Sequence, residues 1–266
     1  MTYDWHRTLQ LTLGSQEWFE EIDRRFLTSH YYAHGKDGTP FGRFLRAELV
    51  AGKTILEVGC GMGTHAALLA RAGAKLTAID ITDFAVKMAQ QRFEIFNLPG
   101  KIQQADAERL PFNDACFDMV WSWGVIHHSY SMEKCLQEIT RVLRDGGHLM
   151  LMLYYRPSIA YYLNCGLLRG VLLGQLFRRR LADIYVAASD GFYARTFTKG
   201  ELKTLLLQSF EQISMSVAGQ KAELFPIPRS RLKEKLEQLT PDWLASAILS
   251  LWGSMIIVEA VKRVVK

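Results

Sequence analysis

Strand-like runs and amphipathic stretches alternate along the chain from residue 53 onward. The short runs suited to strands lie at 53–59, 75–80, 101–106, 116–124 and 148–155. Between them, apolar residues recur every three or four positions, which predicts helices. Strands that alternate with helices form βαβ units around a parallel sheet. The pattern therefore predicts an α/β fold.

Two of the predicted helices show where they begin and end. The helix at 82–97 has Thr82 or Asp83 as its N-cap, because both side chains suit that position. The amphipathic helix at 131–144 places Leu143 on its apolar face, and a DGG turn follows it. We expect both helices to pack on the sheet through their apolar faces.

The alternation stops after Arg156. Residues 156–195 are rich in aromatic and apolar side chains but contain no clear strand, and we expect a lid-like insertion there. An added dimerisation or packing element is the alternative. A capped helix follows from residue 196, and two further strands are predicted at 211–219 and 254–263.

The first fifty residues form a second region. Helices are predicted at 15–27 and 40–50, and the loop at 28–39 is rich in aromatic and polar side chains. We interpret residues 1–50 as an N-terminal helical cap that covers the top of the sheet, with a merely structural extension as the alternative. Residues 51–266 would then form the main domain.

Composition indicates a soluble globular protein, because 49% of the 266 residues are apolar and 22% are charged. No apolar h-region follows the N-terminus and no window has about 18 uninterrupted apolar residues, so neither a signal peptide nor a membrane-spanning helix is expected. The four cysteines fit no metal-binding spacing and are expected to be free thiols. These features favour a cytoplasmic location.

The net charge of +5 is mild, and part of it lies in the insertion. Arg169 and the run 178–180 flank apolar residues there. An anionic substrate, an anionic membrane surface and nucleic acid are the functional interpretations. A solvated helix face is the structural one.

Three glycines alternate at the end of the first predicted strand, at positions 59, 61 and 63. A strand that runs through such a loop into a helix brings backbone N–H groups and a helix N-terminus next to a ligand. The dinucleotide fingerprint G-x-G-x-x-G/A fails here, because its sixth position is Thr64. Asp80 ends the second strand, 80 − 59 = 21 residues after the first glycine, where a carboxylate can accept hydrogen bonds from ribose hydroxyls.

The segment 54–63, with Glu57 two residues before the first glycine, resembles the first motif of class I S-adenosylmethionine-dependent methyltransferases. Further segments resemble that family's later motifs, in the family's order: "QQADAERLPF", "FDMVWSWGVIHH" and "RVLRDGGHLMLM". The resemblance covers about residues 53 to 155 and is closest to small-molecule members of the methyltransferase type 11 kind.

The resemblance implies a Rossmann-like, seven-stranded, mostly parallel sheet in the order 3-2-1-4-5-7-6, with helices on both faces. It also implies S-adenosylmethionine as cofactor and S-adenosylhomocysteine as product. The residues that it assigns to the cofactor are Glu57, Gly59, Gly61, Gly63, Asp80, Ile81, Asp106, Ala107, Ser122 and Trp123.

Within that set the resemblance gives each group a role. Glu57 supports the ammonium group, and Asp80 accepts from both ribose hydroxyls. Ile81 packs on the adenine, Asp106 accepts from its exocyclic amine, and the N–H of Ala107 meets a ring nitrogen. Ser122 and Trp123, at the end of the fourth strand, face the methyl group. Methyl transfer is an in-line displacement, so the enzyme mainly aligns the nucleophile and excludes water.

A base is needed only if the acceptor must lose a proton. His127 is the candidate base and His128 the weaker one, because histidine titrates near neutral pH. Both could instead satisfy local backbone groups. The spacing of His30 and His34 could formally bind a metal, but no third ligand is apparent, and no metal is expected.

Weaker candidates for the acceptor wall come from three places in the chain. Tyr31 and Tyr32 lie in the N-terminal loop, and Tyr154, Tyr155 and Arg156 end the fifth strand, while Arg195 ends the insertion.

We therefore expect an S-adenosylmethionine-dependent methyltransferase that acts on a small molecule, such as a natural product or a quinone-like or lipid-like acceptor. A catalytically silent cofactor-binding scaffold that regulates a partner is the alternative. A nucleic-acid methyltransferase is disfavoured. Base-modifying amino-methyltransferases typically carry an Asn/Asp-Pro-Pro-Tyr/Phe motif after the fourth strand, and this chain has "SWGV" there. Peripheral membrane contact and a monomer or homodimer remain open, as does the acceptor atom.

Overall fold

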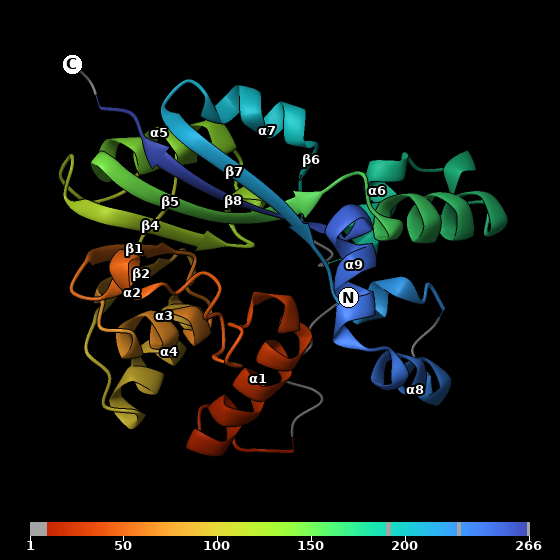
Figure 1. The fold of residues 1–266 in the computed structure, drawn as a ribbon, viewed down its shortest axis with the longest axis horizontal. Helices are drawn as coiled ribbons and strands as arrows, with labels where there is room; N and C mark the ends of the chain where they lie inside the picture. The colour runs from red at the N-terminus through yellow and green to blue at the C-terminus, as the bar shows by residue number, and fades with distance from the viewer. Residues whose placement is uncertain (1–9, 190–192, 228–229, 265–266) are drawn as a thin grey trace.

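The computed structural model describes residues 10–189, 193–227 and 230–264. The expected lack of an apolar h-region concerns the start of the chain, where residues 1–9 lie outside the described residues. Figure 1 shows a central twisted sheet with helices on both faces. Further helices, from residues 160–188 and 231–252, lie beside one end of the strands (Figure 1).

The sheet has the strand order β3-β2-β1-β4-β5-β8-β7, and β6 pairs separately with β5. The strands are β1 (Thr54–Val58), β2 (Lys75–Asp80), β3 (Lys101–Gln104), β4 (Phe117–Trp123), β5 (Leu143–Tyr155), β6 (Thr196–Phe197), β7 (Phe210–Ala218) and β8 (Met255–Lys262). β1 to β5 are parallel, and β8 is antiparallel to both β5 and β7. The predicted α/β fold and its strand order are confirmed, with the two-residue β6 as an addition.

Helices pack on both faces of this sheet (Figure 1). The α-helices are α1 (Gln16–Ser29), α2 (Ala47–Val50), α3 (Thr64–Arg71), α4 (Asp83–Ile95), α5 (Met132–Val142), α6 (Leu181–Ala188), α7 (Lys199–Leu206), α8 (Arg231–Leu239) and α9 (Asp242–Trp252). Shorter or wider helices are η1 (Tyr31–Ala33), η2 (Ile126–His128), the π-helix η3 (Ala160–Leu172), η4 (Gln175–Phe177) and η5 (Lys221–Leu224).

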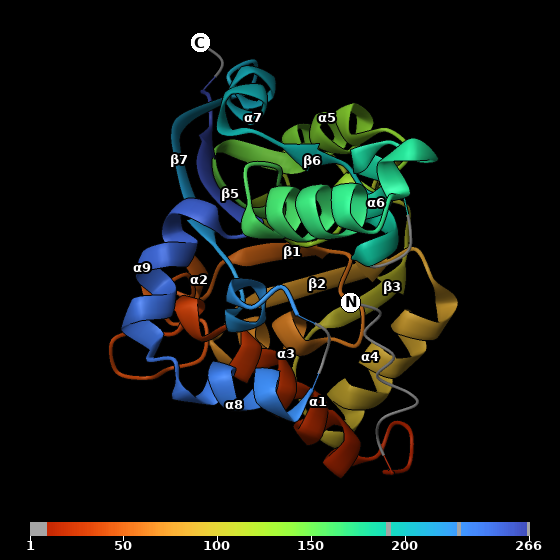
Figure 2. The same cartoon turned by 90° about the vertical axis from the view of Figure 1, so that its right-hand side faces the viewer.

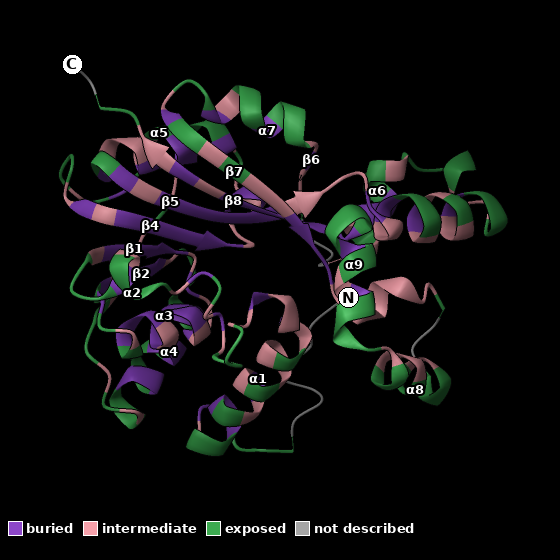
Figure 3. Ribbon diagram, in the orientation of Figure 1, coloured by how far each residue is buried: buried purple, intermediate pink, exposed green. Residues whose placement is uncertain are grey.

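Two buried clusters hold the layers together, one on each face of the sheet. One joins β1, β4 and α3 with aromatic residues from the N-terminal region, and the other joins α5 and α7 to β4, β5 and β8. Figure 3 shows β4 and β5 buried along most of their length. Strands covered on both faces in this way read as continuous apolar runs, which is why the sequence pattern predicted them well.

Two predicted helix boundaries were wrong. In 40–50 only Ala47–Val50 is helical, because Phe41 adopts φ 55° and turns its ring into the core. Helix α5 ends at Val142, since the fully buried Leu143 pairs with Phe117 and begins β5. In both places tertiary burial of an apolar side chain overrides helical periodicity.

Helix α1 packs beside α4, close to the glycine loop that follows β1. Trp18, Phe19 and Ile22 form a buried cluster with Met88 of α4. Asp23 adds polar contacts, because it accepts a hydrogen bond from Thr64 at 2.8 Å and pairs with Arg92 at 2.7 Å.

The insertion after β5 is a helical arm. We use this name for residues 157–189, which contain η3, η4 and α6. Figures 1 and 2 show the arm projecting from the edge where β4 and β5 end. Tyr161, Cys165, Ile184 and Tyr185 form its small buried core. Its service as a lid stays a prediction.

Candidate functional site

The three glycines after β1 are required for different reasons. All three have positive φ, at 78°, 50° and 78° for Gly59, Gly61 and Gly63, a region that favours glycine. A Cβ on Gly59 would stand 2.3 Å from Val125, and one on Gly63 would stand 3.2 Å from the Cβ of Ala89. A Cβ on Gly61 would meet nothing within 4 Å. Open space for a ligand therefore lies at Gly61, while the other two allow close packing.

The N–H groups of this loop are already used within the protein. Gly59 and Cys60 donate to the carbonyl of Ile79 at 2.8 and 2.9 Å, and Gly61 donates to Asp80 at 3.0 Å. Against our expectation of N–H groups pointing at a ligand, these three donors hold the loop to β2. The loop offers a ligand close approach rather than free donors at these positions.

Glu57 lies at the root of the loop and is 2% exposed. Burial raises the pKa of its carboxyl to about 8, helped by the nearby Asp80 carboxylate and opposed by Arg92. Its Oε2 has no hydrogen-bond partner among the described residues. A buried acceptor without a partner is costly, and a cationic group placed beside it would relieve that cost.

Asp80 stands at the end of β2 with its carboxylate partly committed. Oδ1 accepts from the N–H and hydroxyl of Thr82 at 2.9 and 2.8 Å, and Oδ2 accepts from Gly61. A carboxylate has about four lone-pair sites. Two ribose hydroxyls would therefore have to share the remaining one or displace the Thr82 hydroxyl. The neighbouring Ile81 side chain is exposed, as an apolar platform for a ring must be.

Asp106 and Ala107 lie in the turn after β3. Asp106 is exposed, and its Oδ1 accepts from the N–H of Glu108 at 2.8 Å. Ala107 is half-buried and packs against the α5 side of the core. The pairing of β2 with β3 brings this turn to the same edge of the sheet as Asp80.

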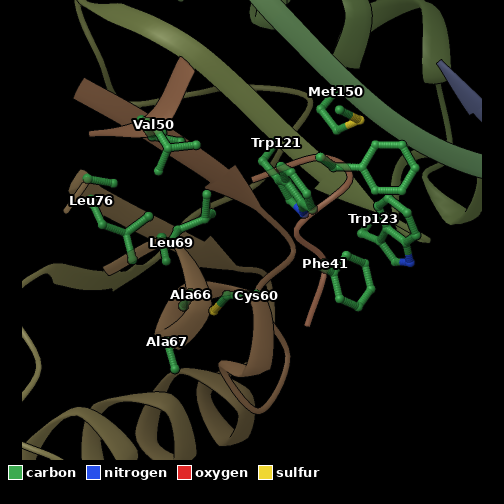
Figure 4. Packing of buried hydrophobic residues seen from close by; sticks show 14 of the residues in the cluster. Phe41, Val50, Cys60, Ala66, Ala67, Leu69, Leu76, Trp121, Trp123 and Met150 are labelled. Carbon is green, nitrogen blue, oxygen red and sulfur yellow. The ribbon is translucent and has the colours of Figure 1, made fainter. Parts of the chain in front are cut away.

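Ser122 and Trp123 end β4 in largely buried positions. Ser122 donates to the carbonyl of Val58 at 3.2 Å. Figure 4 shows Trp123 beside Trp121 and Phe41, and the two indole rings stack with centroids 5.6 Å apart. Trp123 therefore serves the core, and the methyl-facing role of both residues stays a prediction.

His127 follows β4 in the short helix η2 and is 0% exposed. Neither ring nitrogen has a hydrogen-bond partner among the described residues. Burial lowers its pKa well below the ordinary histidine value, with a smaller effect from His128, so the ring is neutral at pH 7. Tyr154 lies over it with ring centroids 4.2 Å apart. The structure thus holds a neutral, unpartnered imidazole under the aromatic end of β5.

His128 differs from its neighbour in being anchored. Its Nδ1 lies 2.9 Å from the carbonyl of Tyr193. Tyr154 also contacts His128 and Tyr185, with centroids 5.6 and 5.9 Å away, and thereby links η2 to the core of the arm. His127, His128 and Tyr154 are thus brought together as one cluster.

The other predicted tyrosines lie apart from this cluster. Tyr32 donates to the sulfur of Met255 at 2.9 Å, at the start of β8, and that position pairs with Tyr154. Tyr31 is half-buried with Lys221 over its ring at 5.4 Å. Tyr155 points to the other face, against the α5 and α7 core.

Both predicted arginines are used to hold the fold. Arg156 donates to the hydroxyl and carbonyl of Thr196 at 3.2 and 2.7 Å and to Glu201 at 2.9 Å. Arg195 donates to the carbonyl of Tyr130 at 2.7 Å and to the hydroxyl of Tyr193 at 2.8 Å. We therefore propose no acceptor-binding role for either guanidinium group.

His30 and His34 form no metal site with a third ligand among the described residues. His30 is buried and its Nδ1 lies 2.8 Å from the carbonyl of Phe26, and burial lowers its pKa to about 4. Cavities of about 190 and 280 Å³ lie elsewhere, around His148 near the start of β5. They are far along the sheet from the glycine loop.

Sequence reasoning missed three groups that shape the site. Val125 covers Gly59, and its place directly after the end of β4 was the available signal. Tyr185 packs on Tyr154, and Arg92 is buried beside the loop with Asp23 as its partner. The last two contacts join distant segments, for which the sequence carries no local signal.

Known proteins resemble this chain both in sequence and in fold. Residues 56–151 match the model of a methyltransferase domain family. A phthiotriol/phenolphthiotriol dimycocerosates methyltransferase of Mycobacterium leprae is 41% identical over 56% of this chain and 61% of its own length. A Mycobacterium ulcerans protein of the same name, numbered 1, is 32% identical over 74% of this chain and 71% of its own length.

A third relative, the 27-O-demethylrifamycin SV methyltransferase of Amycolatopsis mediterranei, is 36% identical over 39% of each chain. A SAM-dependent methyltransferase structure from Thermotoga maritima superimposes with a TM-score of 0.56 at 19% identity, over 93% of this chain and 97% of its own. One from Aquifex aeolicus gives 0.54 at 14% identity, over 91% and 97%. With the M. ulcerans relative matched across most of its length and the strand order in agreement, the chain belongs to the class I S-adenosylmethionine-dependent methyltransferases.

Proposed function

We propose that this methyltransferase transfers its methyl group to a hydroxyl oxygen of a small, largely apolar acceptor, with His127 as the proton acceptor. The observation that carries the proposal is a fully buried, neutral imidazole with two unpartnered nitrogens at the end of β4. Buried polar atoms without partners are rare in proteins, so a group that would use them is implied.

The glycine-loop end fits S-adenosylmethionine. Gly61 leaves room for a close approach, the unpartnered oxygen of Glu57 suits an ammonium group, and Asp80 suits a ribose. Ile81 offers an exposed apolar surface for the adenine. Asp106 and Ala107 would receive its polar edge. When bound, the cofactor supplies a methyl group on a positively charged sulfur.

The His127 end suits an apolar acceptor. Aromatic rings of Tyr154 and Tyr185 stand between η2 and the arm, and they favour an apolar or amphipathic molecule over a highly charged one. His127 would take the hydroxyl proton onto a ring nitrogen as the oxygen attacks. Because the imidazole is fully buried, an acceptor would reach it only after side chains that cover it, such as the ring of Tyr154, are displaced.

The names of the relatives agree with such an acceptor. Two are named for phthiotriol and phenolphthiotriol dimycocerosates, and one for a demethylated oxygen of rifamycin. The first relative is matched over only 61% of its length, so its acceptor is not transferred to this chain. The feature that these names share is a small-molecule acceptor with an oxygen that can carry a methyl group. The free thiols of the described cysteines are compatible with a reducing, cytoplasmic compartment.

Two measurements on the full-length protein test the proposal. Isothermal titration with S-adenosylhomocysteine should show one site, and its absence would remove the function altogether. Incubation with methyl-tritiated S-adenosylmethionine and separate lipid, small-metabolite and RNA extracts of the native host should label the lipid or small-metabolite fraction. Label in RNA alone, or cofactor binding without any labelled acceptor, would contradict the acceptor class.

A further inference from the structure

The far end of the helical arm exposes a compact group of apolar side chains. The π-helix η3 ends at Leu172, the chain turns at Gly174 with φ 66°, and η4 returns toward α6. We call residues 171–177 the tip. Its exposed apolar members are Val171 (58% exposed), Leu172 (67%), Leu173 (66%), Leu176 (43%) and Phe177 (93%).

The tip is held in place by its own contacts. Gly174 donates to the carbonyl of Val171 at 3.1 Å, and Leu173 donates to that of Leu168 at 3.0 Å. A Cβ on Gly170 would stand 2.8 Å from Leu176, so η4 lies directly on η3. The apolar side chains are therefore presented outward by an ordered turn.

The arm also has a buried apolar face, which gives it a core separate from the exposed side chains of the tip. Tyr161 and Cys165 of η3 pack with Ile184 and Tyr185 of α6 at the base. Figure 3 shows buried residues at that base and exposed ones toward the far end. Monomeric proteins rarely expose contiguous apolar patches without a binding role.

Positive charge follows the tip directly. Arg178, Arg179 and Arg180 come after Phe177 and are all exposed. Asp183 is the one acidic residue in the arm, and it pairs with Arg180 at 3.0 Å. The arm thus joins protruding apolar side chains to a net positive charge, with four arginines against one aspartate over residues 157–189.

We propose that the tip docks into the surface of an anionic lipid bilayer. Apolar side chains flanked by Lys or Arg bind the boundary between headgroups and acyl chains, and each basic residue near an anionic surface strengthens binding about five-fold. Pairing of two tips would bring the arginines of both copies together, and RNA would leave the leucines in water. Charge complementarity therefore selects an anionic membrane.

Such docking is peripheral. Across residues 10–189, 193–227 and 230–264, each helix is too short or too polar to cross a bilayer. Helix η3 holds the tip roughly 15–20 Å from the base of the arm. Tyr154 joins that base to His127, so docking would bring the acceptor site close to the lipid surface. This consequence rests on the proposed lipid-like acceptor, whereas docking itself does not.

Vesicle co-sedimentation of the full-length protein tests the docking. The wild type should sediment with vesicles of equal phosphatidylglycerol and phosphatidylcholine at least ten-fold more strongly than with phosphatidylcholine alone, and less strongly as salt rises. The double variant Leu173→Ser/Phe177→Ser should lose binding roughly ten-fold or more. The charge variant Arg178→Glu/Arg179→Glu should lose it by about 25-fold or more.

Two matched controls keep these results specific. Ile95→Ser/Leu207→Ser removes two exposed apolar side chains on α4 and after α7, and Lys75→Glu/Lys101→Glu makes the same net-charge change on the β2–β3 side. Both should bind vesicles like the wild type. All four variants should bind S-adenosylhomocysteine like the wild type, which shows that they fold.

Each alternative outcome is distinct. Absence of vesicle binding by the wild type, or equal losses in tip and control variants, would overturn the docking. A dimer in sedimentation velocity without vesicles that the tip variant abolishes would assign the surface to a second copy. Salt-sensitive RNA binding that needs Arg178 and Arg179, without vesicle binding, would assign it to nucleic acid. Failure of the wild type to bind S-adenosylhomocysteine would instead contradict the proposed function.

Discussion

The two ends of the candidate site differ in how ready they are to receive a ligand. The glycine-loop end is open at Gly61, and its polar groups, such as Asp80, are held by hydrogen bonds. The His127 end is closed, and its buried imidazole has no hydrogen-bond partner for either ring nitrogen among the described residues. Both ends lie along the carboxyl edge of one sheet, where ligands of open α/β folds bind.

This difference follows from what each end is built on. The open end uses a strand, a turn and a helix start that the sheet holds rigid. The closed end depends on the helical arm, which reaches His127 through Tyr154. We infer that the cofactor binds to a preformed surface, while the acceptor requires displacement of aromatic side chains. Five experiments bear on this comparison.

The largest effect is expected at the closed end. His127→Ala should lower turnover by about 10²–10⁴-fold, the range for loss of a general base, with S-adenosylhomocysteine affinity unchanged. His128→Ala is the matched control, because its ring is anchored to Tyr193, and should lower turnover less than ten-fold. Turnover is read as S-adenosylhomocysteine released with the labelled acceptor fraction. Equal losses in the two variants would contradict the assignment of the base.

The same assignment predicts a pH profile. A proton acceptor must be unprotonated, and burial holds the pKa of His127 well below the ordinary 6.5. Turnover should therefore be flat from pH 7 upward and should not show a rise centred on 6.5. A wild-type profile that climbs through 7 to 8 would point to another titrating group.

The next largest effect is expected at the glycine-loop end, where a side chain that fills the open space should weaken cofactor binding. Gly61→Val should weaken S-adenosylhomocysteine binding about 100-fold or more, because the side chain enters the space that the loop leaves open. Gly52→Val is the control, since Gly52 also has positive φ and open space but lies away from the site. Each should lose about 1–2 kcal/mol of stability from left-handed strain. If titration shows equal affinities, Gly61 does not face the cofactor.

Asp80→Asn should have a smaller effect, weakening S-adenosylhomocysteine binding roughly 10–100-fold while turnover at saturating cofactor stays near the wild-type value. A hydrogen bond to a charged group contributes about 1.5–3 kcal/mol, which corresponds to this loss of affinity. Asp83→Asn is the control, because Asp83 is exposed on α4 and pairs with Lys87 at 2.6 Å. A turnover loss that exceeds the affinity loss would remove the division between the two ends.

The smallest effect is a change of stability. Glu57 has a pKa of about 8 in the folded protein and 4.5 as its ordinary value, so the folded state holds the proton more tightly. Stability from this group is therefore full below pH 4.5 and is lost as pH rises toward 8. Glu57→Gln mimics the protonated form and should stabilise the ligand-free protein by on the order of 2–3 kcal/mol at pH 7.5.

Thermal unfolding at pH 5 and pH 7.5 measures this. The difference between Glu57→Gln and wild type should grow with pH, and the variant should bind S-adenosylhomocysteine less tightly. Glu223→Gln provides a comparison, because burial also raises its pKa, to about 7, but it lies by β8 away from the loop. Should both variants weaken the cofactor equally, Glu57 would not support the ammonium group.

The sequence predicted the sheet because its strands are buried and strongly patterned. The positions of β1 to β5 along the chain, the loop at 59–63 and Asp80 at a strand end could all be read from local pattern and spacing. The resemblance to a family added the order of the strands in the sheet. Leu143 and Phe41 show the limit, since long-range packing placed both outside the predicted helices.

The acceptor end was less predictable for a physical reason. Arg156 and Arg195 look like free cations in the sequence, but each is bonded to a residue far along the chain, Glu201 and Tyr130 respectively. Likewise the glycines at 59 and 63 suggested ligand contact, whereas Val125 and Ala89 require them. Only coordinates show which polar or small residue is already used by the fold.

The bonds of Arg156 have a modular consequence. Its guanidinium holds Thr196, and its N–H donates to the carbonyl of Phe197 at 2.9 Å, so the chain leaves and rejoins the sheet at one point. Between these two positions, residues 157–189 form the helical arm, which has its own small buried core. We expect that this arm can be exchanged between homologues while the strands and the glycine loop stay intact, which would let evolution, or an engineer building chimeras, change the acceptor separately from the cofactor.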